Sequence, residues 1–324
     1  MNVRLGRIFV QDQLKSAAPA EDGPLTTGAV LFTILLCVLF GANAVAIKIS
    51  LTGLGVFTTA AIRFSLAALT ILIWALATGK AMRLNLVQFR LLAILALIFY
   101  VQLSLFYIGL SKTTASHGTL IANVLPFVVL VLAHFFIKGD RISTGRIIGL
   151  TLGFSGVLVL LGDTAELSRE ALRGDLIVLC AVLIWGGNAV YTKRIIPLFE
   201  PSQVTFYPVA MSAPLFLLSA LVWDQPMVSQ VDVPIVSAMA YQSFVTASFG
   251  LLGWTTMIKR YGATTLHSYI FIMPLSGVFF GIVLLDEPLT IRLIGAIVLV
   301  TAGLVVVNRN GSRRLIRPKI KISG

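Results

Sequence analysis

Apolar runs of membrane-spanning length make up most of the chain, and short stretches containing Gly, Pro or charged residues separate them. A hydrocarbon core about 30 Å thick is crossed by roughly 20 helical residues. Because lipid offers no hydrogen bonds to the backbone, and because the runs lack strict apolar–polar alternation, they indicate helices rather than strands. The sequence predicts ten transmembrane helices, at 27–50, 56–78, 88–111, 113–136, 142–162, 174–196, 201–223, 234–258, 263–285 and 289–307.

Basic residues are distributed unequally between the two ends of these predicted helices. If the N-terminus is cytoplasmic, nineteen of the 25 Lys and Arg residues lie on the inner side, five lie on the outer side, and Arg63 lies within a helix. The positive-inside rule therefore predicts that both termini are cytoplasmic. Residues 1–26 contain no apolar core of signal-peptide length, so we interpret them as a retained tail, and residues 308–324 as a basic cytoplasmic tail.

Two segments repeat the same polar residues at the same spacing inside apolar runs. FGANAVAIK at 40–48 and WGGNAVYTK at 185–193 each contain a Gly, an Asn, an Ala-Val pair and a Lys in register. Pro126 and Pro274, and RIIG at 146–149 and RLIG at 292–295, recur at similar offsets. Because each copy has an odd number of helices, the second copy must cross the membrane in the opposite direction.

The repeat defines the predicted fold class. We expect an all-α integral membrane protein of ten transmembrane helices, built as two inverted five-helix repeats at 27–162 and 174–307. Inverted repeats are typical of transporters, which bind substrate near the middle of the membrane between the halves.

Composition supports a membrane protein and excludes other classes. Hydrophobic residues make up 57% of the chain and charged residues 12%, against roughly 25% charged residues in soluble domains. The net charge of +12 does not indicate nucleic-acid binding, because the basic residues lie between apolar runs. Cys37 and Cys180 are interpreted as packing residues, and we predict no metal site and no cofactor. Three His, two separated Cys and no paired membrane acids argue against an intramembrane enzyme.

Several motifs together resemble the EamA branch of the drug/metabolite transporter superfamily. They are GANAVAIK, GGNAVYTK, AAIRFSLAAL, LIANVLPFVVLVLAHFFIKGDRIS and HSYIFIMPLSGVFFGIVLLDEPLT, which cover nearly the whole chain from 28 to 307. The resemblance implies transport of small metabolites, often the export of amino acids. One departure is Asp140, which stands where the family usually has Glu.

The repeated asparagines are the first candidate functional residues. A buried amide costs several kcal/mol in hydrocarbon unless it is hydrogen-bonded. Gly41, Gly186 and Gly187 beside Asn43 and Asn188 allow another helix or a ligand to approach the backbone. Two interpretations stay open: the asparagines hold helices together, or they contact substrate.

Positive charge is the second candidate feature. Arg63 is predicted to face a polar cavity or anchor helices, or alternatively to snorkel toward the outer surface. Lys48, Lys112 and His117 add positive potential to the outer half. His117 and His267 each begin a predicted helix, where a histidine either couples proton movement or is a hydrogen-bonded residue at the helix start.

Acidic residues are predicted to lie only in tails, loops or helix ends. A cation site within the membrane needs buried negative charge, so this distribution favours a zwitterionic, anionic or neutral polar substrate. Tyr100, Tyr241 and Tyr269 are candidate cavity residues. Tyr107 and Trp254 are left open between the cavity and the interfacial belt, to which aromatic residues near helix ends more often belong.

Pro126 and Pro274 are predicted to break backbone hydrogen bonds within their helices and to act as hinges. The sequence thus predicts a secondary transporter in the plasma (inner) membrane that exports amino acids or related carboxylate-bearing metabolites. A translocase of a lipid or lipid-linked precursor is the alternative. The expected partners are a small-molecule metabolite and the lipid bilayer, with no nucleic acid, and a homodimer is left open.

Overall fold

The structure, a computed structural model, describes residues 26–136, 143–261, 266 and 269–312. Over these residues the secondary structure is helical, apart from one isolated bridge between Leu54 and Val228. Eight helical segments there are long and apolar enough to cross a membrane, and two further apolar helices, Ile272–Leu285 and Ile291–Val307, are shorter. The chain is therefore an all-α, multi-pass integral membrane protein.

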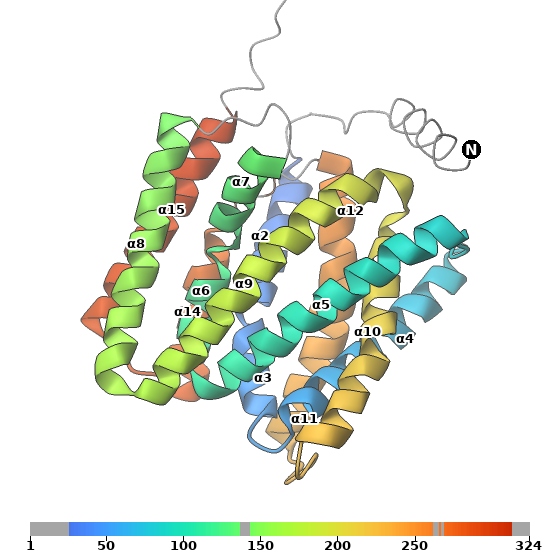
Figure 1. Ribbon diagram of the computed structural model, residues 1–324, viewed down its shortest axis with the longest axis horizontal. Coiled ribbons are helices and arrows are strands. Elements are labelled where there is room, and N and C mark those ends of the chain that lie inside the picture. Colours follow the sequence, from blue (N-terminus) through green and yellow to red (C-terminus); the bar gives the residue numbers. More distant parts are fainter. Residues whose placement is uncertain (1–25, 137–142, 262–265, 267–268, 313–324) are drawn as a thin grey trace, which may run out of the picture.

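The helices follow one another with short connections (Figure 1). They are α2 (Thr27–Gly41), α3 (Asn43–Ser50), α4 (Val56–Ala77), α5 (Leu86–Lys112), α6 (Ala115–Ala122), α7 (Leu125–Phe136), α8 (Thr144–Leu167), α9 (Arg169–Ile195), η1 (Ile196–Leu198), α10 (Pro201–Trp223), α11 (Val233–Ala240), η2 (Tyr241–Gly250), α12 (Leu251–Tyr261), α14 (Ile272–Leu285) and α15 (Ile291–Ser312).

Three of the predicted continuous helices are interrupted. The first is divided at Ala42 into α2 and α3, and the fourth is divided at Asn123 and Val124, directly before Pro126. The eighth contains the π-helical segment η2 between α11 and α12. Hydropathy alone does not indicate such interruptions, because the apolar run continues through each of them. In the ninth, Pro274 lies in the first turn of α14.

One predicted helix begins earlier than its apolar run. The sequence places its start at residue 174, whereas α9 begins at Arg169, after Ser168 has capped it by accepting from the backbone N–H groups of Glu170 and Ala171. A Ser at this position satisfies donors that the first turn leaves without partners. The added polar turns place Asp175 inside the helix instead of at its end.

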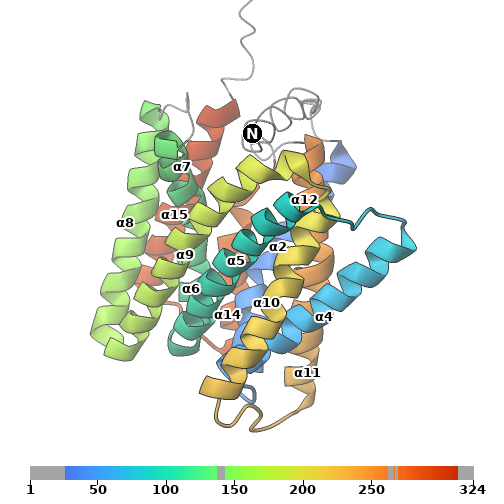
Figure 2. The same cartoon turned by 45° about the vertical axis from the view of Figure 1, so that its right-hand side comes forward.

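Helices of the first half pack along helices of the second half. In both Figure 1 and Figure 2 α8 lies beside α15, and α4 packs against α10 and α5 against α9. Small residues permit the closest approach: a Cβ on Gly149 would lie 2.8 Å from the carbonyl oxygen of Gly303. Backbones that approach this closely gain van der Waals contact, the main source of helix association in lipid.

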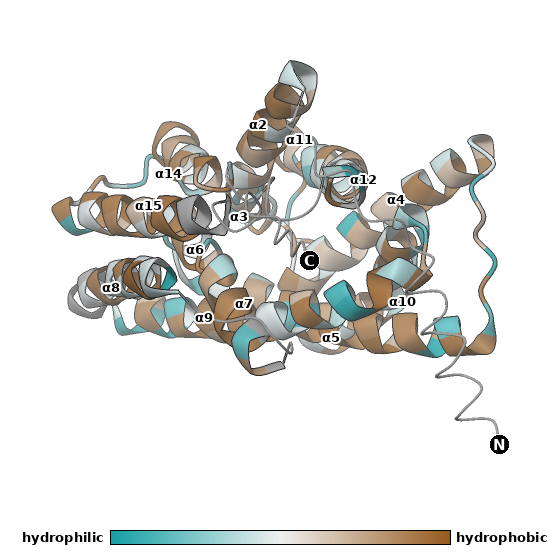
Figure 3. Ribbon diagram, turned by 90° about the horizontal axis from the view of Figure 1, so that it is seen from above, coloured by the Kyte–Doolittle hydropathy of each residue, from teal (hydrophilic) through white to brown (hydrophobic). Residues whose placement is uncertain are grey.

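The helices expose apolar side chains outward. Leu158 of α8 is 69% exposed and Val298 of α15 is 60% exposed. Figure 3 shows hydrophobic positions predominating along the helices, with hydrophilic positions in connecting segments such as the one between α4 and α5. A surface of this kind suits lipid and leaves the polar side chains described next as the distinctive interior feature.

Candidate substrate site

A buried arginine lies at the centre of the principal polar cluster. Arg63 on α4 is 8% exposed. Its Nη1 donates to Tyr107 Oη on α5 at 3.0 Å, and its Nη2 donates to Thr246 Oγ1 on η2 at 3.1 Å. Its Nε is buried and has no hydrogen-bond partner. A guanidinium has five N–H donors, so the Nε–H and further Nη–H donors remain for a ligand.

Further polar side chains extend this arrangement to α3. Thr246 Oγ1 lies 2.9 Å from Asn43 Oδ1, and Tyr107 Oη donates to Gln242 Oε1 at 3.1 Å. Gln242 Nε2 in turn donates to Ser50 Oγ at 2.6 Å. We call Asn43, Ser50, Arg63, Tyr107, Gln242 and Thr246 the Arg63 cluster.

The local fold of η2 explains why the cluster forms there. Gln242 and Thr246 are fully buried on the same π-helical segment, four residues apart. π-Helical segments inside α-helices are rare and occur frequently at functional sites. The segment directs two polar side chains toward α3, α4 and α5 at once.

The electrostatics of the cluster are unbalanced. Among the residues that the structure describes, Arg63 forms no ion pair with a carboxylate. Its guanidinium contacts two neutral hydroxyl groups and the ring of Phe64, whose centroid is 5.1 Å from Cζ. A charge inside the membrane is costly unless an opposite charge or a polar cavity stabilises it. The cluster is therefore a site at which an anionic group would be stabilised.

Two alternatives from the sequence are wrong. Arg63 does not snorkel, because its side chain is buried and bonded to groups on α5 and η2. Tyr107 does not belong to an interfacial belt, because it is fully buried within the Arg63 cluster. In both cases the sequence position near a helix end gave no information on which face of the helix the residue occupies.

Among the described residues, no hydrogen bond joins the two repeated asparagines, Asn43 and Asn188. Asn188 Nδ2 on α9 donates to Gln102 Oε1 on α5 at 2.7 Å, and Thr192 Oγ1 donates to Asn188 Oδ1 at 3.3 Å. Both Asn188 and Gln102 are buried. Asn43 instead bonds to Thr246 and so belongs to the Arg63 cluster.

The glycines beside the asparagines have different surroundings. A Cβ on Gly41 would lie 2.7 Å from the carbonyl oxygen of Met273, so Gly41 permits α2 to approach α14. A Cβ on Gly186 would lie 2.4 Å from Val128 Cγ1 on α7. A Cβ on Gly187 would meet no atom within 4 Å, so close packing does not require glycine there.

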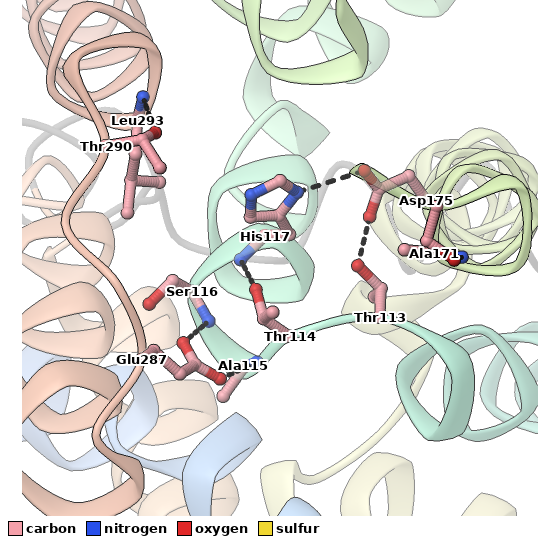
Figure 4. Close-up of polar contacts among 11 residues, drawn as sticks. Thr113, Thr114, Ala115, Ser116, His117, Ala171, Asp175, Glu287, Thr290 and Leu293 are labelled. Atoms are coloured by element: carbon pink, nitrogen blue, oxygen red, sulfur yellow. Dashed lines mark hydrogen bonds and ion pairs between the residues drawn. The ribbon is translucent and has the colours of Figure 1, made fainter. Parts of the chain in front are cut away.

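A second buried polar group lies at the start of α6 (Figure 4). His117 Nδ1 is 3.0 Å from Asp175 Oδ2 on α9, and Thr113 Oγ1 donates to Asp175 Oδ1 at 2.5 Å. Glu287 caps the same helix by accepting from the backbone N–H groups of Ala115 and Ser116. An acid at a helix N-terminus is stabilised by the helix dipole.

Asp175 corrects the predicted distribution of acids. It is fully buried and lies in the second turn of α9, whereas the sequence places every acid in a tail, loop or helix end. His117 is hydrogen-bonded at the start of its helix, through its backbone N–H to Thr114 Oγ1. The ring also forms the pair with Asp175, so His117 is both a helix-start residue and a member of an interhelical pair.

The candidate tyrosines occupy separate positions. Tyr100 Oη is 2.5 Å from Ser219 Oγ on α10, and Tyr241 Oη donates to the carbonyl of Leu39 at 2.7 Å. Tyr269 is half-buried in the turn before α14. Among the described residues, no hydrogen bond joins any of these three tyrosines to the Arg63 cluster. Asp140 and His267 lie outside the described residues.

Sequence reasoning missed the two glutamines and Thr246. A signal was present, because Gln102 and Gln242 are uncharged amides inside apolar runs. The same argument that selected the asparagines, the cost of a buried amide, applies to both glutamines. Thr246 gave no such signal, since threonine is common in membrane helices and can bond to its own backbone.

A many-helix membrane bundle with a buried polar cluster between its helices has the construction of a membrane transporter. The model of the EamA-like transporter family matches residues 27–162 and 172–309, and the chain belongs to this family. The family predicted from the motifs is thereby confirmed, and the match covers two EamA-like repeats. The chain is a transporter, not an enzyme.

Relatives of known sequence agree. The chain is 25% identical over 281 residues to a probable amino-acid metabolite efflux pump of Escherichia coli (strain K12), covering 84% of this chain and 92% of that protein. It is 25% identical over 251 residues to an uncharacterized transporter, YyaM, of Bacillus subtilis (strain 168), covering 75% of this chain and 81% of that protein. A crystal structure with 19% identity and a TM-score of 0.67 covers 90% of this chain and 100% of that one, and shows the fold alone.

Proposed function

We propose that the protein is a secondary transporter that exports amino acids or related carboxylate-bearing metabolites by alternating access. The observation that supports this substrate class is the buried guanidinium of Arg63, whose hydrogen-bonded partners are neutral and whose Nε has none. A substrate carboxylate can accept two parallel hydrogen bonds from a guanidinium. It would also supply the negative charge that the cluster lacks.

The Arg63 cluster would bind substrate by exchanging partners. Tyr107 and Thr246 occupy Nη1 and Nη2 in this structure. A carboxylate that engages Nε and one Nη makes stronger hydrogen bonds than a neutral hydroxyl oxygen does, and it would compete with Tyr107 or Thr246 for the guanidinium. Because Thr246 also lies against Asn43, this exchange would alter the contact between η2 and α3.

We further propose ten membrane crossings in two inverted repeats. Two interhelical pairs support the symmetry: Asn43 with Thr246, and Gln102 with Asn188. Asn188 follows Asn43 by 145 positions, and Thr246 follows Gln102 by 144. The two pairs are therefore equivalent under the repeat: the asparagine is in the first half in one pair and in the second half in the other. The packing of α4 with α10 and of α8 with α15 supports the same relation.

Orientation and direction are part of the proposal. The excess of Lys and Arg at one side of the predicted helices supports cytoplasmic termini in the plasma (inner) membrane. Export is supported by the name of the Escherichia coli relative, a probable amino-acid metabolite efflux pump. The interruptions at Ala42 and at Asn123–Val124 supply the hinges, since they divide two helices that border the two polar groups.

The experiment is counterflow in proteoliposomes with a panel of labelled compounds. We expect exchange of amino acids or organic acids, weaker exchange of the corresponding amides, and none of permanent cations such as choline. Vesicles without protein are the control. A fluorescent-lipid translocation assay on the same vesicles tests the alternative: transbilayer movement of lipid without metabolite exchange would replace this proposal with a lipid translocase.

A further inference from the structure

A pocket of about 380 Å³ opens where α3 and α5 end, α4 begins and α10 ends. Its volume falls within the range of small-molecule sites, about 300 to 1,000 Å³. It is lined by Lys48, Leu51, Thr52, Leu54, Gly55, Val56, Ser111, Trp223, Asp224, Gln225 and Pro226. The lining thus combines one cationic side chain, one anionic side chain and an apolar wall.

The structure holds the cationic group in place and leaves it a donor. Lys48 Nζ donates to the backbone carbonyls of Leu110 at 3.2 Å and Thr113 at 2.8 Å. These carbonyls lie at the C-terminal end of α5, where a positive charge is stabilised by the helix dipole. A lysine ammonium has three donors, so two are used by these carbonyls and the third can serve a ligand.

The anionic group is held in a similar way. Asp224 is 9% exposed, and its Oδ2 accepts from the backbone N–H of Thr58 at 2.6 Å and from Thr58 Oγ1 at 2.9 Å. Both bonds fix the carboxylate over the first turn of α4. The other oxygen, Oδ1, accepts none of the described hydrogen bonds and can serve a ligand.

The two charges line one pocket without pairing with each other. Among the described residues, the Lys48 ammonium nitrogen forms no ion pair within 4 Å with the Asp224 carboxylate. Opposite charges that are fixed apart in one pocket match a ligand that carries both charges. An α-amino acid is such a ligand, with adjacent ammonium and carboxylate groups.

We propose that this pocket is a second amino-acid site, which binds the substrate carboxylate at Lys48, the ammonium at Asp224 and the side chain against Leu51, Leu54 and Trp223. The assignment rests on the proposed function. Ser111 lies one turn of α5 from Tyr107, and Leu51 follows Ser50, so the pocket adjoins the Arg63 cluster. In the proposed orientation it lies on the outer side and is the exit site of the transport path.

The test is binding to the purified full-length protein in detergent micelles, measured without transport. Trp223 lines the pocket, so ligand binding should change the fluorescence of the wild type and not that of Trp223→Phe. The probes are L-leucine, leucine methyl ester, which lacks the carboxylate, and N-acetylleucine, which lacks the ammonium. Loss of one charge-assisted hydrogen bond should weaken binding at least about tenfold, so leucine should bind more tightly than either analogue.

Variants assign each charge to its residue. Lys48→Gln should abolish the preference for leucine over its methyl ester, and Asp224→Asn, which can still accept from Thr58, should abolish the preference over N-acetylleucine. Lys112→Gln is the matched control, because Lys112 is a lysine near the same end of the molecule that pairs with Glu170 outside the pocket. Its affinities should equal those of the wild type.

The inference is wrong if the three probes bind the wild type equally, if Trp223 fluorescence does not respond, or if Lys48→Gln retains the preference. Failure of the transport proposal is a separate result. Amino-acid counterflow with no Trp223 response would remove the pocket site and leave the function, whereas selective leucine binding without counterflow would leave the site and remove the function.

Discussion

The pair formed by Asn188 and Gln102 gives a quantitative test of how the repeated asparagines act. Asn188→Leu removes the donor of the 2.7 Å hydrogen bond and leaves the Gln102 amide oxygen, in a side chain that is 1% exposed, without this partner. Gln102→Leu likewise leaves the Asn188 amide nitrogen without its acceptor. Replacing both residues removes the pair without leaving either amide behind.

The magnitude follows from the geometry. Leaving one buried polar group without a hydrogen-bond partner lowers the free energy of unfolding by about 1 to 3 kcal/mol, whereas replacing both partners with apolar groups changes it little. Interhelical hydrogen bonds in membranes average about 0.6 kcal/mol and reach about 1.7 kcal/mol. Because this bond is short and both residues are buried, we expect each single variant to lose about 1 to 2 kcal/mol and the double variant almost none. The coupling energy should therefore be about 2 to 4 kcal/mol.

The assay is a double-mutant cycle on the free energy of unfolding in micelles, combined with counterflow of a carboxylated substrate. If the pair only holds α9 against α5, the double variant should recover both stability and transport. If Asn188 also contacts substrate, stability should recover while transport stays low. Additive losses, with a coupling energy near zero, would refute the reasoning that this hydrogen bond joins the two helices.

Three further results are expected. Asp175→Ala should lower the free energy of unfolding by about 3 kcal/mol, because it leaves His117 and Thr113 without this carboxylate, and Asp175→Asn should lower it less. Equal losses in a thermal unfolding assay would contradict the pairing of Asp175 with these two residues. Gly149→Ala should destabilise by about 1 to 3 kcal/mol through its clash with the Gly303 carbonyl, whereas Gly162→Ala, with no atom within 4 Å, should be neutral in the same assay. A topology reporter fused after Gly324 should be cytoplasmic and one in the 224–232 loop external, and the reverse pattern would overturn the orientation.

The helical class and the family were predictable because they depend on patterns that extend along the whole chain. Apolar runs of about 20 residues identify membrane helices irrespective of how they pack. Repeated residues such as Asn43 and Asn188 stand out against an apolar background. Both patterns can be recognised in the sequence without any knowledge of tertiary contacts.

The composition of the site was less predictable because it depends on which helix faces meet. Tyr107 lies near a helix end in sequence, yet α4 and η2 cover it completely. Asp175 precedes most of its apolar run, yet it lies within α9 and contacts His117 of α6. Hydropathy reports how apolar a segment is and not the direction in which a given side chain points.

The role of Arg63 in binding a substrate carboxylate can be measured in reconstituted vesicles as the ratio of uptake of a carboxylated substrate to uptake of its amide. Arg63→Gln retains hydrogen-bonding ability and removes the charge, and Arg90→Gln, an exposed arginine at the start of α5, is the control. We expect the ratio to fall at least about tenfold in Arg63→Gln and to be unchanged in Arg90→Gln. A ratio that is the same in Arg63→Gln and wild type would show that Arg63 does not bind the substrate carboxylate.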